Sequence, residues 1–237
     1  MGQDFFSFKQ FTVFHNQCAM KVGIDGVLLG AWANVSNVNS VLDVGTGSGL
    51  ISLMIAQRCN ANIHAIDIDE GAVVQSIFNF KESVWANRLN VEQISLKDFS
   101  EISNRKFDLI ISNPPFFVNS LNAPDAQRNT ARHTTTLTHE ELAIYSKKLL
   151  NKTGRICLIL PVVEGYKIID FAKTIGLHCC KLVKVFPKPN AQAKRLLIEL
   201  SFEDESYQET ELRIESDTRH IYSPQFSALV RDFYLKL

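Results

Sequence analysis

The chain has 237 residues, of which 46% are hydrophobic and 21% charged, and its formal net charge at pH 7 is zero. These values are ordinary for a single globular domain with a sizeable core, and no apolar run is long enough to cross a bilayer as a helix. A neutral chain is also a poor candidate for holding long nucleic acid by its phosphates alone. The charge is uneven, because residues 181–195 carry basic and no acidic side chains, whereas acids dominate residues 203–217.

The N-terminus and the cysteines indicate the compartment. The first ten residues, MGQDFFSFKQ, lack the charged region and the cleavage site of a secretory signal peptide. The five cysteines are an odd number without metal-like spacing, and the neighbours Cys179 and Cys180 fall in an apolar segment that favours a core position. We therefore expect a reduced, cytoplasmic chain that binds no metal and no membrane.

The first 37 residues are predicted to form a hairpin and a helix. Apolar residues alternate over residues 6–13, which favours a hairpin, and a helix is expected to begin at about Asp25. No linker separates this region from the rest of the chain. We therefore interpret residues 1–37 as an elaboration of a single domain whose core spans residues 38–237.

The remainder of the chain alternates strand and helix patterns. Strands are predicted at residues 41–44, 63–68, 91–96, 107–112, 155–161, 177–187 and 193–202. Helices are predicted at residues 49–58, 71–86 and 139–150, and from the fifth strand to Gly176. This alternation is typical of a Rossmann-like, doubly wound α/β fold, so we expect a mostly parallel, seven-stranded sheet. A proline-bearing loop joins the last two strands, which predicts an antiparallel edge.

A glycine-rich turn follows the first predicted strand. Asp43 lies at the end of this strand, and Gly45, Gly47 and Gly49 lead into a helix. Glycine lets the backbone turn tightly and lets a ligand approach the main chain. The G-x-G-x-G spacing differs from the dinucleotide fingerprint G-x-G-x-x-G and fits a ligand without a pyrophosphate. It resembles the loop of S-adenosylmethionine-dependent methyltransferases, in which the acid helps to position the ammonium group of the cofactor; taken alone, such a turn is common.

Further acids follow the next two strands. Asp67 lies near the end of the second strand, where nucleotide-binding α/β folds place a carboxylate on ribose hydroxyls. Asp98 and Phe99 follow the third strand and are placed to accept from an adenine amino group and to flank its ring. Each acid alone is better explained as a helix cap or a surface residue. Asp69 is an alternative to Asp67 as the carboxylate that binds the ribose hydroxyls. Together with the glycine turn, however, they predict cofactor binding at the carboxyl ends of the strands.

The fourth strand ends in Asn113, Pro114, Pro115 and Phe116, which resembles the [DNS]-P-P-[YFW] motif of amino-group methyltransferases. An exocyclic amino group is a poor nucleophile because its lone pair is delocalised into the ring. The Asn113 side-chain oxygen and the Pro114 carbonyl are placed to accept its two N–H groups and to hold it for methyl transfer. The prolines fix the backbone of these acceptors, and Phe116 offers a flat face for stacking. The alternative is that the prolines merely end the strand.

Three further segments resemble the tRNA valine-specific adenine-37 N6-methyltransferase family and extend the resemblance over essentially the whole chain. They are residues 10–33 (QFTVFHNQCAMKVGIDGVLLGAWA), 131–142 (ARHTTTLTHEEL) and 226–237 (FSALVRDFYLKL). The resemblance implies methylation of N6 of a flipped-out adenine beside the anticodon of a tRNA, with S-adenosyl-L-methionine as the methyl donor. It also implies that Lys21, Gly23 and Asp25 close over the methionine end of the cofactor.

The identity of the methylated amine rests on this resemblance. Phe116 stands where tyrosine is frequent among N6-adenine enzymes, and phenylalanine also suits the rRNA guanine-N2 methyltransferases. Those enzymes usually carry an additional domain, and protein glutamine methyltransferases usually carry a helical N-terminal domain; neither feature is expected here. A non-catalytic member that binds only cofactor or RNA is the third alternative, and the intact Asn-Pro-Pro-Phe motif speaks against it.

Candidate RNA contacts form two basic groups. They are Arg128, Arg132 and His133, beyond the Asn-Pro-Pro-Phe motif, and Lys188, Lys194 and Arg195, which flank a proline loop. Both groups are candidates for contact with the phosphates of an anticodon loop. The simplest alternative for each is a solvated surface.

Overall fold

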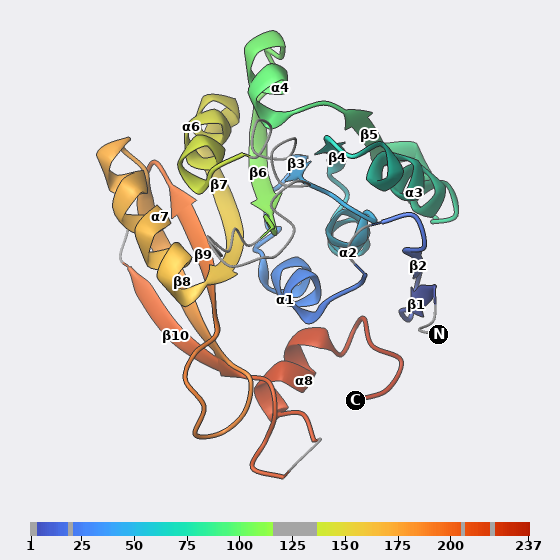
Figure 1. The fold of residues 1–237 in the computed structure, drawn as a ribbon, viewed down its shortest axis with the longest axis vertical. Helices are drawn as coiled ribbons and strands as arrows, with labels where there is room; N and C mark the ends of the chain where they lie inside the picture. The colour runs from blue at the N-terminus through green and yellow to red at the C-terminus, as the bar shows by residue number, and fades with distance from the viewer. Residues whose placement is uncertain (1–3, 19–20, 116–136, 205–206, 219–220) are drawn as a thin grey trace, which may run out of the picture.

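The computed structural model describes residues 4–18, 21–115, 137–204, 207–218 and 221–237 (Figure 1). Most of these residues belong to one large sheet and the helices on its two faces. A separate hairpin of β1 (Phe5–Ser7) and β2 (Thr12–Phe14) lies at the N-terminal end. Among the described residues, no helix has the length and apolar character needed to cross a membrane.

The large sheet has eight strands and is mostly parallel. In spatial order these are β10 (Gln208–Arg213), β8 (His178–Phe186), β9 (Arg195–Ser201), β7 (Leu150–Pro161), β6 (Phe107–Ser112), β3 (Ser40–Val44), β4 (Asn62–Asp67) and β5 (Leu89–Gln93). Only β9 runs antiparallel to its neighbours β7 and β8; the other pairs are parallel.

The mostly parallel α/β sheet confirms the expected fold class, with two differences. The additional strand, β10, is exposed except at Leu212 and therefore lacks the apolar alternation that marks a strand in sequence. Because β10 pairs in parallel with β8, the antiparallel strand β9 lies inside the sheet and not at its edge.

Helices cover both faces of the sheet, as Figure 1 shows. The helices α1 (Ile24–Trp32), α2 (Leu50–Arg58) and α8 (Pro224–Val230) pack on one face, and α4 (Leu96–Ile102), α6 (His139–Leu149) and α7 (Val162–Thr174) on the other. The helix α3 (Glu70–Lys81) lies against β4, β5 and β2, and a short 3₁₀ helix (Ala86–Arg88) precedes β5. Strand side chains alternate between the two cores: Leu109 and Ile111 of β6 join the α1/α2 core, and Ile110 joins the other.

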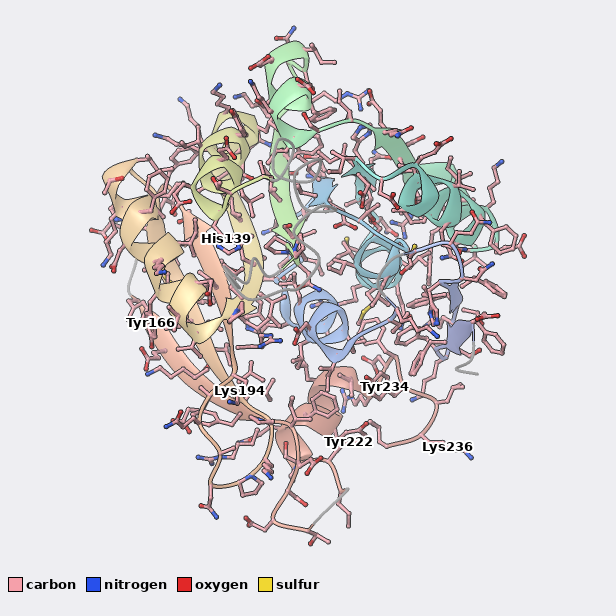
Figure 2. The ribbon with its side chains drawn as sticks, in the orientation of Figure 1. His139, Tyr166, Lys194, Tyr222, Tyr234 and Lys236 are labelled. Atoms are coloured by element: carbon pink, nitrogen blue, oxygen red, sulfur yellow. The ribbon has the colours of Figure 1, made fainter. Side chains whose placement is uncertain are left out.

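The N-terminal hairpin is held by the C-terminal segment. The Lys9 amide donates to the carbonyl of Phe233 at 2.8 Å. The ring of Tyr234 lies 5.8 Å from Phe6 and 6.1 Å from Phe8, between ring centroids, and Figure 2 shows Tyr234 beside α8. The two ends of the described chain therefore stabilise each other although they are far apart in sequence.

Strand register brings several strand ends to one edge of the sheet. Val44, near the end of β3, lies opposite Ser112 of β6 and Ile66 of β4. Because these strands are parallel, the loops that follow them emerge side by side. The glycine turn, Asp67 and Asn113 thus all belong to the carboxyl edge of the sheet.

The helices α1 and α2 pack closely on each other beside this edge of the sheet, and a substitution at their contact tests how close the packing is. A Cβ atom at Gly30 would lie 2.8 Å from Sδ and 3.0 Å from Cβ of the fully buried Met54. Gly30→Val is therefore expected to lower the free energy of unfolding by about 1–3 kcal/mol. Ile24→Val, at the more exposed start of the same helix, should change it by less than about 0.5 kcal/mol. Urea denaturation followed by circular dichroism measures both, and wild-type stability of Gly30→Val would contradict the close approach.

Candidate functional site

The glycine turn between β3 and α2 adopts the conformation that its sequence predicts. Gly45, Gly47 and Gly49 have φ values of +70°, +56° and +80°. A Cβ atom at Gly49 would lie 2.5 Å from Cε1 of Phe80, so no larger residue fits there. An added Cβ at Gly45 or Gly47 would meet no described atom within 4 Å, so a ligand can approach the backbone at these two positions.

Asp43 is a fully buried carboxylate beneath this turn. Its Oδ2 accepts hydrogen bonds from the hydroxyls of Thr46 and Ser52, each at 2.7 Å, whereas Oδ1 has no partner among the described residues. Burial raises the pKa of the carboxyl to about 6, although the two hydroxyls act in the opposite direction. An ionised Asp43 therefore faces no cation among the described residues, and a ligand ammonium group would stabilise its charge.

Asp67 lies beside the glycine turn at the end of β4. Its Oδ2 accepts from the Gly47 amide at 2.9 Å, and its Oδ1 accepts from the Asp69 amide at 3.0 Å. Asp69 instead caps α3, because its carboxylate accepts from the Ala72 amide at 2.9 Å. Between the two acids, Ile68 exposes 55% of its surface. The sequence did not predict this exposed apolar side chain at the carboxyl edge, because Ile68 has the pattern of the last residue of a buried strand.

Asp98 and Phe99 lie in α4, a helix that the sequence did not predict after the third strand. Ser95 caps α4 by accepting from the Asp98 amide, and its hydroxyl lies 2.6 Å from Asp98 Oδ2. Phe99 is 4% exposed and packs against His64 and Phe107, with ring centroids 5.1 and 6.2 Å away. Because Phe107 begins β6, Phe99 faces the core toward the amino ends of the strands, and the expected contact with an adenine ring is wrong. Asp98 remains exposed in the first turn of α4.

Asn113 follows directly on β6. The hydroxyl of the preceding Ser112 donates to the carbonyl of Val44 at 2.8 Å, which fixes the end of β6 against β3. The side-chain oxygen of Asn113 is buried and has no hydrogen-bond partner among the described residues. Pro114 is buried and Pro115 exposed, and Phe116 lies outside the described residues. Asp43 Oδ1 and Asn113 Oδ1, two buried oxygens without partners in the described part of the chain, thus belong to the ends of adjacent strands.

The N-terminal residues expected over the cofactor are Lys21, Gly23 and Asp25, and in the described part of the chain no hydrogen bond or ion pair joins them to the site residues described above. Gly23 precedes α1, and Lys21 is exposed. Asp25 accepts from Nε of Arg195 at 2.8 Å. Asp25, predicted to contact the cofactor, and Arg195, predicted to contact RNA, are therefore bound to each other. Their ion pair joins the start of α1 to the start of β9.

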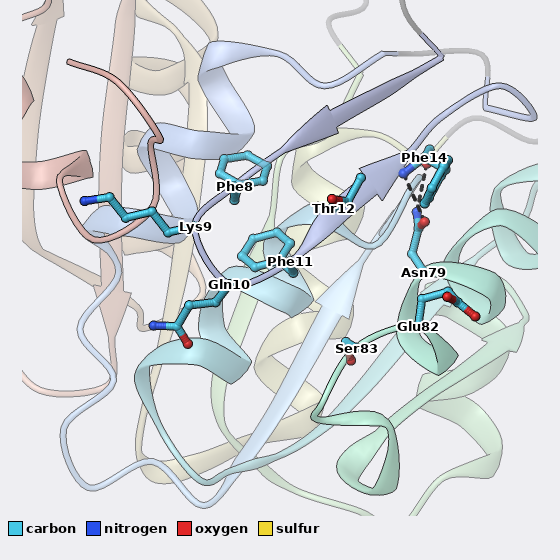
Figure 3. Close-up of a pocket in the computed structure, with 9 residues that line it drawn as sticks. All are labelled: Phe8, Lys9, Gln10, Phe11, Thr12, Phe14, Asn79, Glu82 and Ser83. Carbon is cyan, nitrogen blue, oxygen red and sulfur yellow. Dashed lines mark hydrogen bonds between the residues drawn. The ribbon is translucent and has the colours of Figure 1, made fainter.

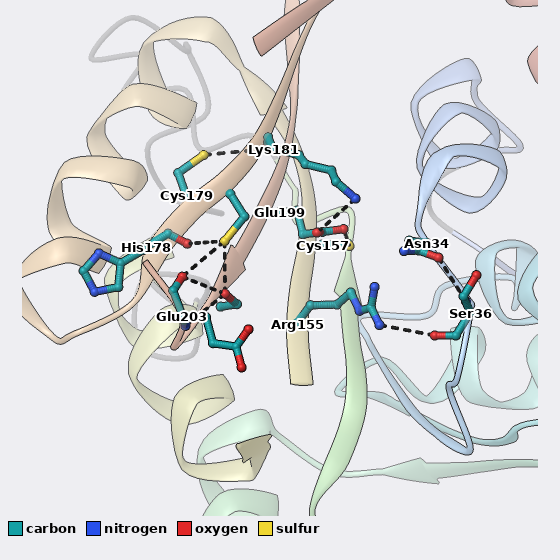
Figure 4. A network of polar contacts seen from close by, with 11 residues as sticks. Asn34, Ser36, Arg155, Cys157, His178, Cys179, Lys181, Glu199 and Glu203 are labelled. Atoms are coloured by element: carbon teal, nitrogen blue, oxygen red, sulfur yellow. Dashed lines mark hydrogen bonds and ion pairs between the residues drawn. The ribbon is translucent and has the colours of Figure 1, made fainter. Parts of the chain in front are cut away.

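The basic stretch of residues 181–195 is largely neutralised by acids that are distant in sequence. Besides the Arg195–Asp25 pair, Nζ of Lys181 lies 3.6 Å from the buried carboxylate of Glu199, as Figure 4 shows. Nζ of Lys184 lies 2.5 Å from the exposed carboxylate of Glu209. Its remaining cations, Lys188 and Lys194, are exposed and pair with no acid among the described residues; Figure 2 places Lys194 near the start of β9.

One group of expected RNA contacts cannot be placed at this site. Arg128, Arg132 and His133 lie outside the described residues. Among the residues that the structure does describe, no group of three or more histidines, cysteines or carboxylates is arranged to bind a metal ion. The groups assembled at this edge are hydrogen-bond-accepting oxygens and backbone amides, which suit an organic ligand with an ammonium group and hydroxyls.

Sequence comparison identifies close relatives. The family model "Methyltransferase small domain" matches residues 27–185. A tRNA1(Val) (adenine(37)-N6)-methyltransferase of Parabacteroides distasonis is 48% identical over 238 residues, which cover 100% of both chains. The protein of the same name from Trichodesmium erythraeum is 42% identical, again over 100% of both chains.

Solved structures share the fold. A protein described as a predicted O-methyltransferase of Agrobacterium tumefaciens superposes with a TM-score of 0.69 at 16% identity, over 88% of this chain and 96% of the other. A methyltransferase solved in complex with S-adenosylhomocysteine (SAH) superposes with a TM-score of 0.58 at 13% identity, over 84% of this chain and 56% of the other. At these identities the comparison establishes the fold.

The raised pKa of Asp43 predicts that the stability of the ligand-free chain depends on pH. The carboxyl ionises near 3.8 when unfolded and at about 6 when folded, so the folded state binds the proton more tightly between these values. The stabilisation is complete below about pH 4 and is lost as the pH rises through about 6, by up to about 3 kcal/mol. Asp43→Asn removes this loss. Its free energy of unfolding, relative to the wild type, should therefore rise between about pH 4 and pH 7.

Chemical denaturation at a series of pH values measures this difference. Asp170→Asn is the control, because the Asp170 side chain is 80% exposed; its difference from the wild type should stay small and nearly constant. A constant difference for Asp43→Asn as well would show that Asp43 ionises as an ordinary carboxyl.

Proposed function

Because the chain belongs to the tRNA1(Val) (adenine(37)-N6)-methyltransferase family, we propose that it transfers the methyl group of S-adenosyl-L-methionine to N6 of adenine 37 in a valine tRNA. The observation that carries the proposal is the buried Asn113 side-chain oxygen, which has no partner among the described residues at the carboxyl edge. A buried polar atom without a partner costs about 1–3 kcal/mol, so a substrate N–H that it accepts is strongly favoured. A tRNA substrate also supports a cytoplasmic location.

The cofactor part of the proposal uses the edge beside Asn113. Asp43 Oδ1 is assigned to the ammonium group and Asp67 to the ribose hydroxyls, with Gly45 and Gly47 leaving room for close approach. Bound cofactor supplies the electrophilic methyl group. Asp98 is kept as a candidate partner of the adenine amino group, because its carboxylate is exposed beside the end of β5.

The chain's own contribution to the reaction is positioning. Asn113 Oδ1 and the Pro114 carbonyl accept the two N–H groups of the target amine, which orients its lone pair toward the methyl group. The methylated nitrogen carries a positive charge and is acidic, so its proton passes to solvent without a strong general base. The rings of Pro114 and Pro115 keep the acceptors in place before the substrate binds.

The catalytic assignment is tested by Asn113→Ala. With labelled S-adenosyl-L-methionine and a valine tRNA transcript, the wild type should yield N6-methyladenosine after digestion to nucleosides. The variant should lose about 100-fold or more in kcat, because an acceptor that orients the amine is missing. Its Kd for SAH, measured by calorimetry, should stay within about tenfold of the wild type.

Controls make this result specific. Asn62→Ala removes an exposed amide at the opposite, amino edge of the sheet and should leave kcat unchanged. A transcript with guanosine at position 37 should not be labelled. Label in N2-methylguanosine of rRNA, or in protein alone, would refute the proposed substrate, and full activity of Asn113→Ala would refute the role of Asn113.

The RNA surface is tested separately at Lys188 and Lys194. We assign phosphate contacts to these lysines because they pair with no acid among the described residues, whereas Arg195 is bound to Asp25. The double variant Lys188→Ala with Lys194→Ala should raise KM for tRNA about 3–10-fold and reduce the salt dependence of binding by about one released ion per lysine. KM for the cofactor should not change. Lys173→Ala, on the outer surface of α7 beside Asp170, is the control, and equal salt slopes for the double variant and the wild type would contradict the assignment.

A further inference from the structure

Two buried amide side chains on α3 bind backbone outside their own helix. Gln75 is 3% and Asn79 1% exposed, and they lie one helical turn apart. Buried amides are unfavourable unless their hydrogen bonds are made. The partners of these amides come from two segments, the end of the N-terminal hairpin and the glycine turn.

Asn79 contacts both segments at once. Its Oδ1 accepts from the Phe14 amide at 3.0 Å, and its Nδ2 donates to the Phe14 carbonyl at 2.8 Å, as Figure 3 shows. The same Nδ2 donates to the carbonyl of Ser48 at 2.8 Å. Ser48 lies between Gly47 and Gly49, so one side chain connects the last residue of β2 to the turn proposed to contact the cofactor.

Gln75 and Gly71 continue the contact toward the N-terminus of α3. Gln75 Oε1 accepts from the Gln17 amide at 3.0 Å. Gly71 allows close approach, because a Cβ atom there would lie 2.7 Å from the Gln17 carbonyl oxygen. Residues 14–17 therefore run along one face of α3. Burial raises the pKa of the thiol of the next residue, Cys18, and the charges of the nearby Asp67 and Asp69 raise it further.

We propose that Asn79, assisted by Gln75, is a positioning residue that couples the N-terminal hairpin to the glycine turn. Docking of residues 14–18 on α3 and binding of the cofactor at the turn then stabilise each other. This inference rests on the proposed cofactor site. Coupling of this kind is reciprocal, so each event must increase the affinity of the other by the same factor.

The unmodified chain provides the first test. Hydrogen exchange followed by mass spectrometry is measured with and without SAH. Saturating SAH should slow exchange in peptides that cover residues 12–18 as well as in those that cover the glycine turn. Slower exchange at the turn with no change in residues 12–18 would overturn the coupling. Failure of the wild type to bind SAH at all would instead refute the proposed cofactor site.

Substitutions provide the second test. Asn79→Leu keeps the approximate volume and removes all three hydrogen bonds. Ser76→Ala is the matched control, because Ser76 is fully buried on the same helix and its hydroxyl bonds, among the described residues, to the Val73 carbonyl of that helix. Asn79→Leu should raise the Kd for SAH about tenfold, speed exchange of residues 12–18, and leave kcat at saturating cofactor within about twofold. Ser76→Ala should change none of these.

A third variant keeps the test decisive if Asn79→Leu does not fold. Asn79→Asp retains an acceptor for the Phe14 amide but loses both donors, including the bond to Ser48. It should therefore weaken SAH binding while KM for tRNA stays the same. Wild-type affinity for SAH in a folded Asn79 variant would overturn the proposal without affecting the assignment of Asn113.

Discussion

The pairing of β3 with β6 is the constraint on which the site depends. Val44 lies opposite Ser112, and the buried Ser112 hydroxyl bonds to the Val44 carbonyl. This register places Asp43 toward α2, where hydroxyls bind it, and puts Asn113 beside the glycine turn. A shift of one residue would turn Asp43 to the opposite face of the sheet. The turn, the start of α2 and the position of Asp67 all depend on the same alignment.

Much of this site could be predicted because its residues end strongly apolar strands. An acid or an amide at such a position stands out, and glycines after Asp43 have few structural alternatives. The failures have physical causes. α4 spans only seven residues, of which Leu96 and Phe99 are buried, so it is too short to be read as a helix, and Phe99 was expected to flank a ligand ring. β10 is defined by backbone pairing to β8 and not by its own side chains.

Contacts between segments that are distant in the chain could not be predicted from the sequence either. Asp25 and Arg195 are 170 residues apart and meet because β9 is inserted antiparallel beside β7. Similar pairs at Lys181 and Lys184 neutralise a stretch that is basic in sequence. RNA bound at this surface, as proposed, would therefore depend on a few exposed lysines and on shape, and less on a broad positive field.

If Asp43 binds the methyl donor as proposed, its buried carboxylate links that donor to the lifetime of the protein. When no cation faces its second oxygen, the folded chain carries an unfavourable charge at neutral pH. Any ligand that binds only the folded state shifts the folding equilibrium toward that state, and the shift grows with the ratio of the free ligand concentration to Kd. Cells degrade proteins largely through their transiently unfolded forms. A shortage of donor should then deplete the enzyme itself as well as its reaction, so that the amount of protein follows the supply of methyl groups.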